Sequence, residues 1–103
     1  MVGCAQSKFD KMRSDYDKLE KFTNELAIST KKLNDQCKRL HTQFFEHQSH
    51  GTLTEDFKQF ALKSCQTSLE ATEKLEIAQK ELLVRYVELQ SLQGSERLNG
   101  LKP

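Results

Sequence analysis

The sequence predicts an all-α fold, an antiparallel hairpin of two long helices of the coiled-coil type. Good helix formers dominate the 103-residue chain, and its one proline is the last residue. Apolar residues recur at alternating spacings of three and four along the first half, and a break containing a glycine follows near the middle. A chain of this length has room for one small domain. We therefore expect residues 1–94 to form a single helical hairpin.

The first helix is expected over residues 6–48, where a heptad pattern runs without interruption. One set of positions is apolar at every seventh residue: Met12, Leu19, Leu26, Leu33 and Leu40. The interleaved set is more mixed: Phe9, Tyr16, Thr23, Thr30, Cys37 and Phe44. In a coiled coil these two sets form the stripe that faces the partner helix. Threonine and cysteine, in place of isoleucine or valine, argue against a free-standing parallel leucine zipper.

The break predicts a tight turn over residues 49–53. Gly51 accepts the left-handed conformation that closes many helix C-termini. Thr52 and Glu55 have the spacing of a capping box, in which each side chain binds the backbone N–H of the other residue. Because the connection is short, the second helix, expected over 54–93, should run antiparallel to the first. The polar segment 95–103 is predicted to be a flexible tail.

Folding the chain at Gly51 pairs residues that are equally distant from it, and six of these pairs repeat the same residue type. The like pairs are Leu40 with Leu62, Cys37 with Cys65, Leu33 with Leu69, Thr30 with Thr72, Leu19 with Leu83, and Tyr16 with Tyr86. Three pairs break the pattern: Leu26 with Glu76, Thr23 with Gln79, and Met12 with Gln90. The turn also allows a register displaced by one residue. In the mirrored register the middle of the hairpin is expected to be the softer part.

The mirrored register leaves a second apolar stripe on the second helix without a partner. Its residues follow the same spacing of three and four: Ala71, Leu75, Ala78, Leu82, Leu89 and Leu92. An apolar stripe left in water is a mark of an interaction surface. We therefore expect the hairpin to be completed to a four-helix bundle, either by forming a homodimer or by binding helical segments of another protein.

Cys37 and Cys65 are a candidate redox pair, because the hairpin brings their Cα atoms within reach of a disulfide. The chain has three cysteines, an odd number, and its N-terminal residues do not resemble a secretory signal. These features favour reduced thiols and a cytoplasmic location. Two small buried thiols are the expected state, and a redox clamp on the hairpin is the alternative.

Charge and motifs argue against several classes of function. The formal net charge of +1 disfavours nucleic-acid binding. His41, His47 and His50 lack the paired spacing of a zinc site, so no metal or cofactor is expected. The sequence has no Gly-rich phosphate loop and no nucleophile beside a base, so we do not expect an enzyme. A small basic cluster is expected to be a solvated surface: Lys31, Lys32, Lys38 and Arg39.

The leading expectation is a non-catalytic helical interaction module, a small adaptor or assembly subunit of a larger complex. An alternative follows from a resemblance. The run YDKLEKFTNELAISTKKLNDQCKRL, from Tyr16 to Leu40, resembles the first helix of BAR domains, where an amphipathic stripe and lysine pairs recur in a long curved dimer. This resemblance covers about a quarter of the chain. It implies a protein that binds a membrane surface.

Overall fold

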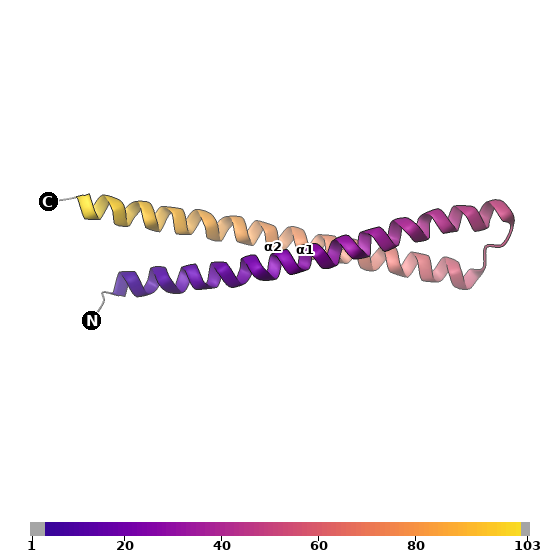
Figure 1. The fold of residues 1–103 in the computed structure, drawn as a ribbon, viewed down its shortest axis with the longest axis horizontal. Coiled ribbons are helices and arrows are strands. Elements are labelled where there is room, and N and C mark those ends of the chain that lie inside the picture. Colours follow the sequence, from indigo (N-terminus) through magenta and orange to yellow (C-terminus); the bar gives the residue numbers. More distant parts are fainter. Residues whose placement is uncertain (1–3, 102–103) are drawn as a thin grey trace. The chain divides into compact units, whose positions relative to one another are not determined.

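The computed structural model describes the backbone of residues 4–101 and the side chains of residues 8–94. Two helices form, α1 (Cys4–His50) and α2 (Glu55–Leu101), and they run antiparallel (Figure 1). The predicted all-α hairpin is therefore confirmed. The chain divides into two compact units. Unit 1 contains Met1–Asn24 and Ile77–Pro103, and unit 2 contains Glu25–Glu76, so each unit holds a segment of both helices.

Gly51 ends α1 as the sequence predicts. Its φ angle is 67°, which lies in the left-handed region. The backbone N–H of Gly51 donates to the carbonyl of Gln48 at 3.3 Å, and that of Thr52 donates to the carbonyl of His47 at 2.9 Å. These two hydrogen bonds make a Schellman motif, which satisfies carbonyls that the end of a helix leaves without partners.

The start of α2 differs from the predicted capping box of Thr52 and Glu55. Thr54 is the N-cap, since its Oγ1 accepts a hydrogen bond from the backbone N–H of Phe57 at 3.1 Å. Thr52 belongs instead to the end of α1, where its Oγ1 lies 2.8 Å from Nδ1 of His47. The prediction was wrong because the Schellman motif already uses Thr52, so the helix begins two residues later.

The N-cap can be tested by replacing one hydroxyl. We expect Thr54→Ala to lower the free energy of unfolding by about 1 kcal/mol, because the N–H of Phe57 loses its acceptor. Thr67→Ala is the matched control, since the Thr67 hydroxyl is exposed and only donates to the carbonyl of Lys63 in its own helix. Urea unfolding measures both variants. A loss of equal size in the two would contradict the assignment of Thr54.

The C-terminal part of α2 is another correction. The helix continues to Leu101, whereas the sequence predicted that it ends near residue 93 and that a flexible tail begins at 95. Gly94 costs roughly 1 kcal/mol relative to alanine in a helix, but it keeps its backbone N–H and does not interrupt the hydrogen-bond ladder. Residues 102–103, also part of the predicted tail, lie outside the described residues.

The face of α1 that packs against α2 is the one its heptads predict. Within it Thr23, Thr30 and Leu40 are buried. The other heptad residues are half-buried, while most of their neighbours are exposed: Phe9, Met12, Tyr16, Leu19, Leu26, Leu33, Cys37 and Phe44. In each unit these residues, with those of α2 that face them, form the seam of the hairpin. The periodicity of α1 therefore predicted its inner face correctly.

The face of α2 in the seam is displaced by one residue from the mirrored register. The buried residues of α2 are Ala61, Ser68, Ala78 and Leu89. Each lies one position before its predicted counterpart: Leu62, Leu69, Gln79 and Gln90. Thr30 shows the same displacement, because its Oγ1 donates to the carbonyl of Ala71 at 3.5 Å. Leu62, Leu69 and Leu83, expected in the seam, are 55%, 60% and 64% exposed.

Packing explains why this register is preferred. The displacement puts Leu75 in place of Glu76 on the level of Leu26, and Leu89 in place of Gln90 on the level of Met12. The layers that failed in the mirrored register thus gain an apolar partner. Burying a leucine stabilises by roughly 1.5–3 kcal/mol, whereas a like pair of residues has no such advantage of its own.

Candidate functional site

The stripe predicted as the interaction surface lies inside the hairpin. Ala78 and Leu89 are each 8% exposed. The other four residues of the stripe are half-buried: Ala71, Leu75, Leu82 and Leu92. The prediction that an isolated hairpin exposes this stripe is therefore wrong. It followed from the mirrored register, which assigned the neighbouring positions to the seam.

A different apolar surface of α2 faces away from the seam. It belongs to unit 1 and consists of Ile77, Leu83, Val84 and Val87, which are 68%, 64%, 50% and 55% exposed. We call these four residues the outer α2 face. Their spacings of three, four and seven put them on one side of a helix. Ala78, Leu82 and Leu89 lie on the opposite side, so α2 is apolar on both sides in this unit.

Charged residues lie within and beside the outer α2 face. Glu76 and Lys80 are exposed on the same side of the helix. Arg85 and Glu81 form an exposed ion pair, with Nε and Oε1 separated by 3.0 Å. Lys80 is three or four residues from Ile77, Leu83 and Val84, so the outer α2 face is an apolar surface interrupted by one lysine. The heptad spacing gives two apolar stripes in α2, and the register of the hairpin decides which of them faces α1.

In unit 2 a disulfide joins Cys37 of α1 to Cys65 of α2, with a distance of 4.9 Å between their Cα atoms. The predicted proximity of the two cysteines is therefore confirmed. The sequence left two states open, a pair of reduced thiols and a disulfide, and the structure contains the disulfide. Both residues are half-buried. Cys65 lies beside the seam and bonds across it to Cys37 of α1.

A shallow groove of about 260 Å³ lies beside the disulfide. Its lining is mostly apolar: His41, Phe44, Phe45, Lys58, Ala61, Leu62 and Cys65. The His41 ring packs edge-on against Phe45, with 4.7 Å between the ring centroids. Phe45 and Leu62 are 52% and 55% exposed, so the groove is open to solvent. Cys65 is the half of the disulfide that contributes to this lining.

A polar cluster occupies the seam close to the disulfide. The Oδ1 atom of Asn34 accepts hydrogen bonds from the hydroxyls of Ser68 and Thr72, the latter at 3.5 Å. Ser68 is only 6% exposed, so Asn34 provides its buried hydroxyl with a partner from the other helix. A buried polar group without a partner is costly, and such a pair favours one register over its neighbours.

This role of Asn34 predicts an asymmetric effect of mutation. We expect Asn34→Ala to destabilise the chain by about 1–2 kcal/mol, because the Ser68 hydroxyl stays buried without an acceptor. Ser68→Ala should cost less, since half-buried Asn34 can still bind water. In Ser68→Ala chains, the further change Asn34→Ala should then cost little. Urea unfolding of the four chains measures this coupling, and additive losses would contradict it.

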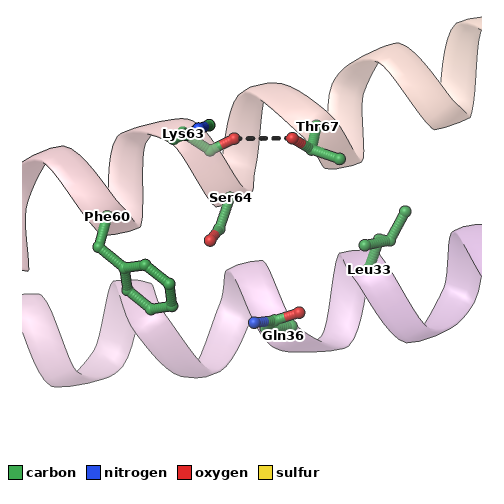
Figure 2. Close-up of a pocket in the computed structure, with 6 residues that line it drawn as sticks. All are labelled: Leu33, Gln36, Phe60, Lys63, Ser64 and Thr67. Atoms are coloured by element: carbon green, nitrogen blue, oxygen red, sulfur yellow. Dashed lines mark hydrogen bonds between the residues drawn. The ribbon is translucent and has the colours of Figure 1, made fainter.

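Figure 2 shows a second hollow of unit 2, with a volume of about 300 Å³. It lies between the two helices, with Leu33 and Gln36 from α1 on one side. The residues from α2 are Phe60, Lys63, Ser64 and Thr67. The Thr67 hydroxyl donates to the Lys63 carbonyl at 3.0 Å. One amine, with no carboxylate or imidazole among these six residues, gives the hollow no acid–base pair.

The three histidines near the turn make separate contacts. The Nδ1 atom of His47 lies 2.8 Å from Oγ1 of Thr52, and Nδ1 of His50 lies 2.7 Å from the carbonyl oxygen of Glu46. His41 packs on Phe45. The basic cluster is exposed, as predicted: Lys31, Lys32, Lys38 and Arg39.

Tyr16 and Tyr86 meet across the seam of unit 1, with ring centroids 6.2 Å apart. The predicted pair is therefore confirmed, although Tyr86 remains 48% exposed. Burial raises the pKa of Tyr16 above its ordinary value of 10.0, and the nearby Glu20 carboxylate raises this pKa further. The phenol is thus harder to ionise in the folded chain than in the unfolded chain.

The raised pKa of Tyr16 predicts a loss of stability in alkali. Its contribution is fully present below pH 10 and is lost as pH rises through the folded pKa, since the unfolded chain releases the proton first. We expect the melting temperature to fall above pH 10, and to fall less in Tyr16→Phe. Lysines titrate in this range too, but they are common to both chains. Equal pH dependence in the two chains would contradict this role of Tyr16.

Comparisons and helix composition give no further indication of the site. Neither helix, as far as the structure describes it, has a segment apolar and long enough to cross a membrane. No protein-family model matches this chain, and neither does any curated protein or solved structure with which it was compared.

Proposed function

We propose that this protein is a non-catalytic helical interaction module, a small assembly subunit that binds through the outer α2 face. The observation that carries the proposal is the composition of α2 in unit 1. The helix presents Leu82 and Leu89 to α1 and Ile77 and Val84 to solvent. Apolar residues that gather in water on one side of a helix are a mark of an interaction surface. The outer α2 face therefore requires a partner that the hairpin itself does not supply.

The limited core supports the same proposal. Among the residues whose side chains are described, no large side chain is fully buried. Several large apolar residues of α2 are half exposed or more. A two-helix hairpin buries too little apolar surface to offset the entropy of ordering its chain by a wide margin. A partner that covers the outer α2 face would contribute the missing burial.

A second copy of the chain is the partner we propose first. Packing of two outer α2 faces around a two-fold axis would complete a four-helix bundle, because a two-fold interface joins a surface to itself. The outer α2 face suits such an arrangement, since its aliphatic residues can pack on identical residues. Docking of helical segments from a different protein is the other arrangement compatible with this surface.

The solution mass of the purified chain, measured by light scattering over a wide range of concentration, tests the proposal. We expect a dimer that dissociates on dilution. The chain could instead stay monomeric while a helical partner, once added, slows amide hydrogen exchange in the outer α2 face. That result would support an adaptor in place of a homodimer. A monomer that no helical partner protects would contradict the interaction module.

The membrane-surface alternative receives less support from the charges around this surface. Near the outer α2 face the exposed acids Glu76, Glu81 and Glu88 outnumber the exposed bases Lys80 and Arg85, so this surface has no excess of positive charge to attract anionic lipids. Sedimentation with anionic liposomes at low and high salt measures this alternative. We expect no salt-sensitive binding, and binding that salt abolishes would favour the BAR-like function.

A further inference from the structure

The disulfide lies in the part of the seam with the fewest large apolar residues. Between residues 30–37 of α1 and 64–72 of α2, Leu33 is the one large aliphatic residue directed into the seam. The other seam residues described there, apart from the two cysteines, are small or polar: Thr30, Asn34, Gln36, Ser64, Ser68, Ala71 and Thr72. Small residues allow the helices to approach closely, but they contribute little hydrophobic stabilisation. The Cys37–Cys65 bond therefore supplements the hydrogen bonds of Thr30 and Asn34 as a covalent link between the helices in this segment.

One side of the disulfide is accessible. Cys65 lines the apolar groove of about 260 Å³, and Cys37 does not contribute to that lining. Phe45 and Leu62 at its border are more than half exposed, so a small thiol can reach Cys65 from solvent. The groove therefore gives a nucleophile a route to Cys65, and the same groove is not lined by Cys37.

The groove also favours an incoming anion. Lys58 belongs to its lining, and the Lys58 side chain is 47% exposed. Glu55 is the nearby acid, with 3.8 Å between its Oε2 and Nζ of Lys58. Its side chain is 73% exposed, so solvent screens it strongly. A partly exposed ammonium group beside a cysteine favours the approach of a thiolate.

We propose that the Cys37–Cys65 bond is a reversible redox clamp, with Cys65 as the site of attack by a dithiol reductant. A thiolate of the dithiol attacks Cys65, the Cys65–Cys37 bond breaks, and Cys37 leaves as a thiolate that takes up a proton. The second thiol of the reductant then displaces Cys65 from the mixed disulfide. The protein gains two electrons and two protons, and the reductant becomes a disulfide. Reduction loosens the seam between residues 30–37 and 64–72.

The site of attack can be mapped with glutathione, a monothiol, on the oxidised Cys4→Ser chain. The first product is a mixed disulfide, so quenching at short times with acid and a thiol-alkylating agent traps the adduct on the cysteine attacked, before a second glutathione or the freed cysteine displaces it. We expect mass spectrometry to find adduct on Cys65 in several-fold excess over Cys37. Lys58→Ala should slow adduct formation, whereas Lys63→Ala, which changes the lining of the other hollow, should not. Adduct distributed equally, or mainly on Cys37, would overturn the assignment.

Loosening of the seam is tested by hydrogen exchange on the same chain before and after dithiothreitol. We expect amide exchange in 30–37 and 64–72 to rise at least roughly tenfold, while 78–89 in unit 1 changes little. The melting temperature should fall by roughly 10–25 °C, the effect typical of losing a disulfide in a small domain. Unchanged exchange in unit 2 would overturn the clamp. The double variant Cys37→Ser, Cys65→Ser should match the reduced chain, and the reduced chain itself decides the matter if that variant fails to fold.

Discussion

Replacing Leu82 and Leu89 together by glutamate is expected to unfold the hairpin. Leu89 is 8% exposed and Leu82 is half-buried against α1. Truncating a buried leucine alone costs about 2–5 kcal/mol, and a carboxylate in its place adds the cost of burying a charge. Two such changes exceed the stability of most small domains. Far-UV circular dichroism should show loss of most of the helical signal.

The matched control for this experiment moves both substitutions by one residue. Leu83→Glu with Gln90→Glu introduces the same two charges at the same spacing, but both positions are exposed. We expect this chain to remain helical, even though Leu83 belongs to the outer α2 face. The mirrored register predicts the opposite order, with the control unfolded and the chain carrying glutamates at 82 and 89 folded. Loss of helix in both chains would show that this part of α2 tolerates no charge.

Replacing Ile77 and Val84 together by glutamate is expected to abolish self-association while leaving the helices intact. These residues are 68% and 50% exposed, so the single chain does not bury them. In a two-fold dimer four such side chains lose their burial, and each contributes roughly 1.5 kcal/mol or more. We expect the dimer to weaken by roughly three orders of magnitude or more, as measured by light scattering.

Gln59→Glu with Gln66→Glu is the control for the outer α2 face. It adds two charges at the same spacing to exposed positions that carry no apolar surface. We expect this chain to associate as the unmodified protein does. If the Ile77→Glu, Val84→Glu chain also keeps its dimer, the outer α2 face is not the interface. If that chain loses its helices, the assignment of these residues to the outside of the hairpin is wrong.

Local chemistry made much of this fold predictable from the sequence. The heptads of α1 identified its inner face, because α1 has a single continuous apolar stripe. Gly51 identified the end of that helix, since a left-handed position strongly favours glycine. Thr52 was assigned to the wrong helix end, because two threonines precede Glu55 and either could serve as the N-cap. Which of the two threonines caps α2 depends on the hydrogen bonds that end α1.

The register was not predictable, for a reason specific to α2. This helix carries two apolar stripes, so Leu82 and Leu83 each have apolar companions three or four residues away. Two of the like pairs of the mirrored register, Cys37 with Cys65 and Tyr16 with Tyr86, meet in the structure although it has the other register. Cys65 and Tyr86 flank the seam, where long or bonded side chains reach across. The apolar side of α2 that is exposed was misplaced as a consequence.

The state of the cysteines also lay beyond the sequence. The hairpin predicted that Cys37 and Cys65 come close, because their proximity follows from the turn. Whether a thiol pair is oxidised depends on the surroundings of the protein as well as on distance. The accessible groove beside Cys65 is a further feature that only the packing of His41, Phe45 and Leu62 reveals.

The inner face of α2 can be tested most directly by comparing two neighbouring cysteine substitutions. Ala78→Cys and Gln79→Cys are made separately in the oxidised Cys4→Ser chain, so that each has one free thiol. Ala78 is 8% exposed and Gln79 is exposed. We predict that a maleimide labels the cysteine at position 79 at least roughly tenfold faster than the one at position 78. Faster labelling at position 78 would restore the mirrored register and contradict the assignment of the two faces of α2.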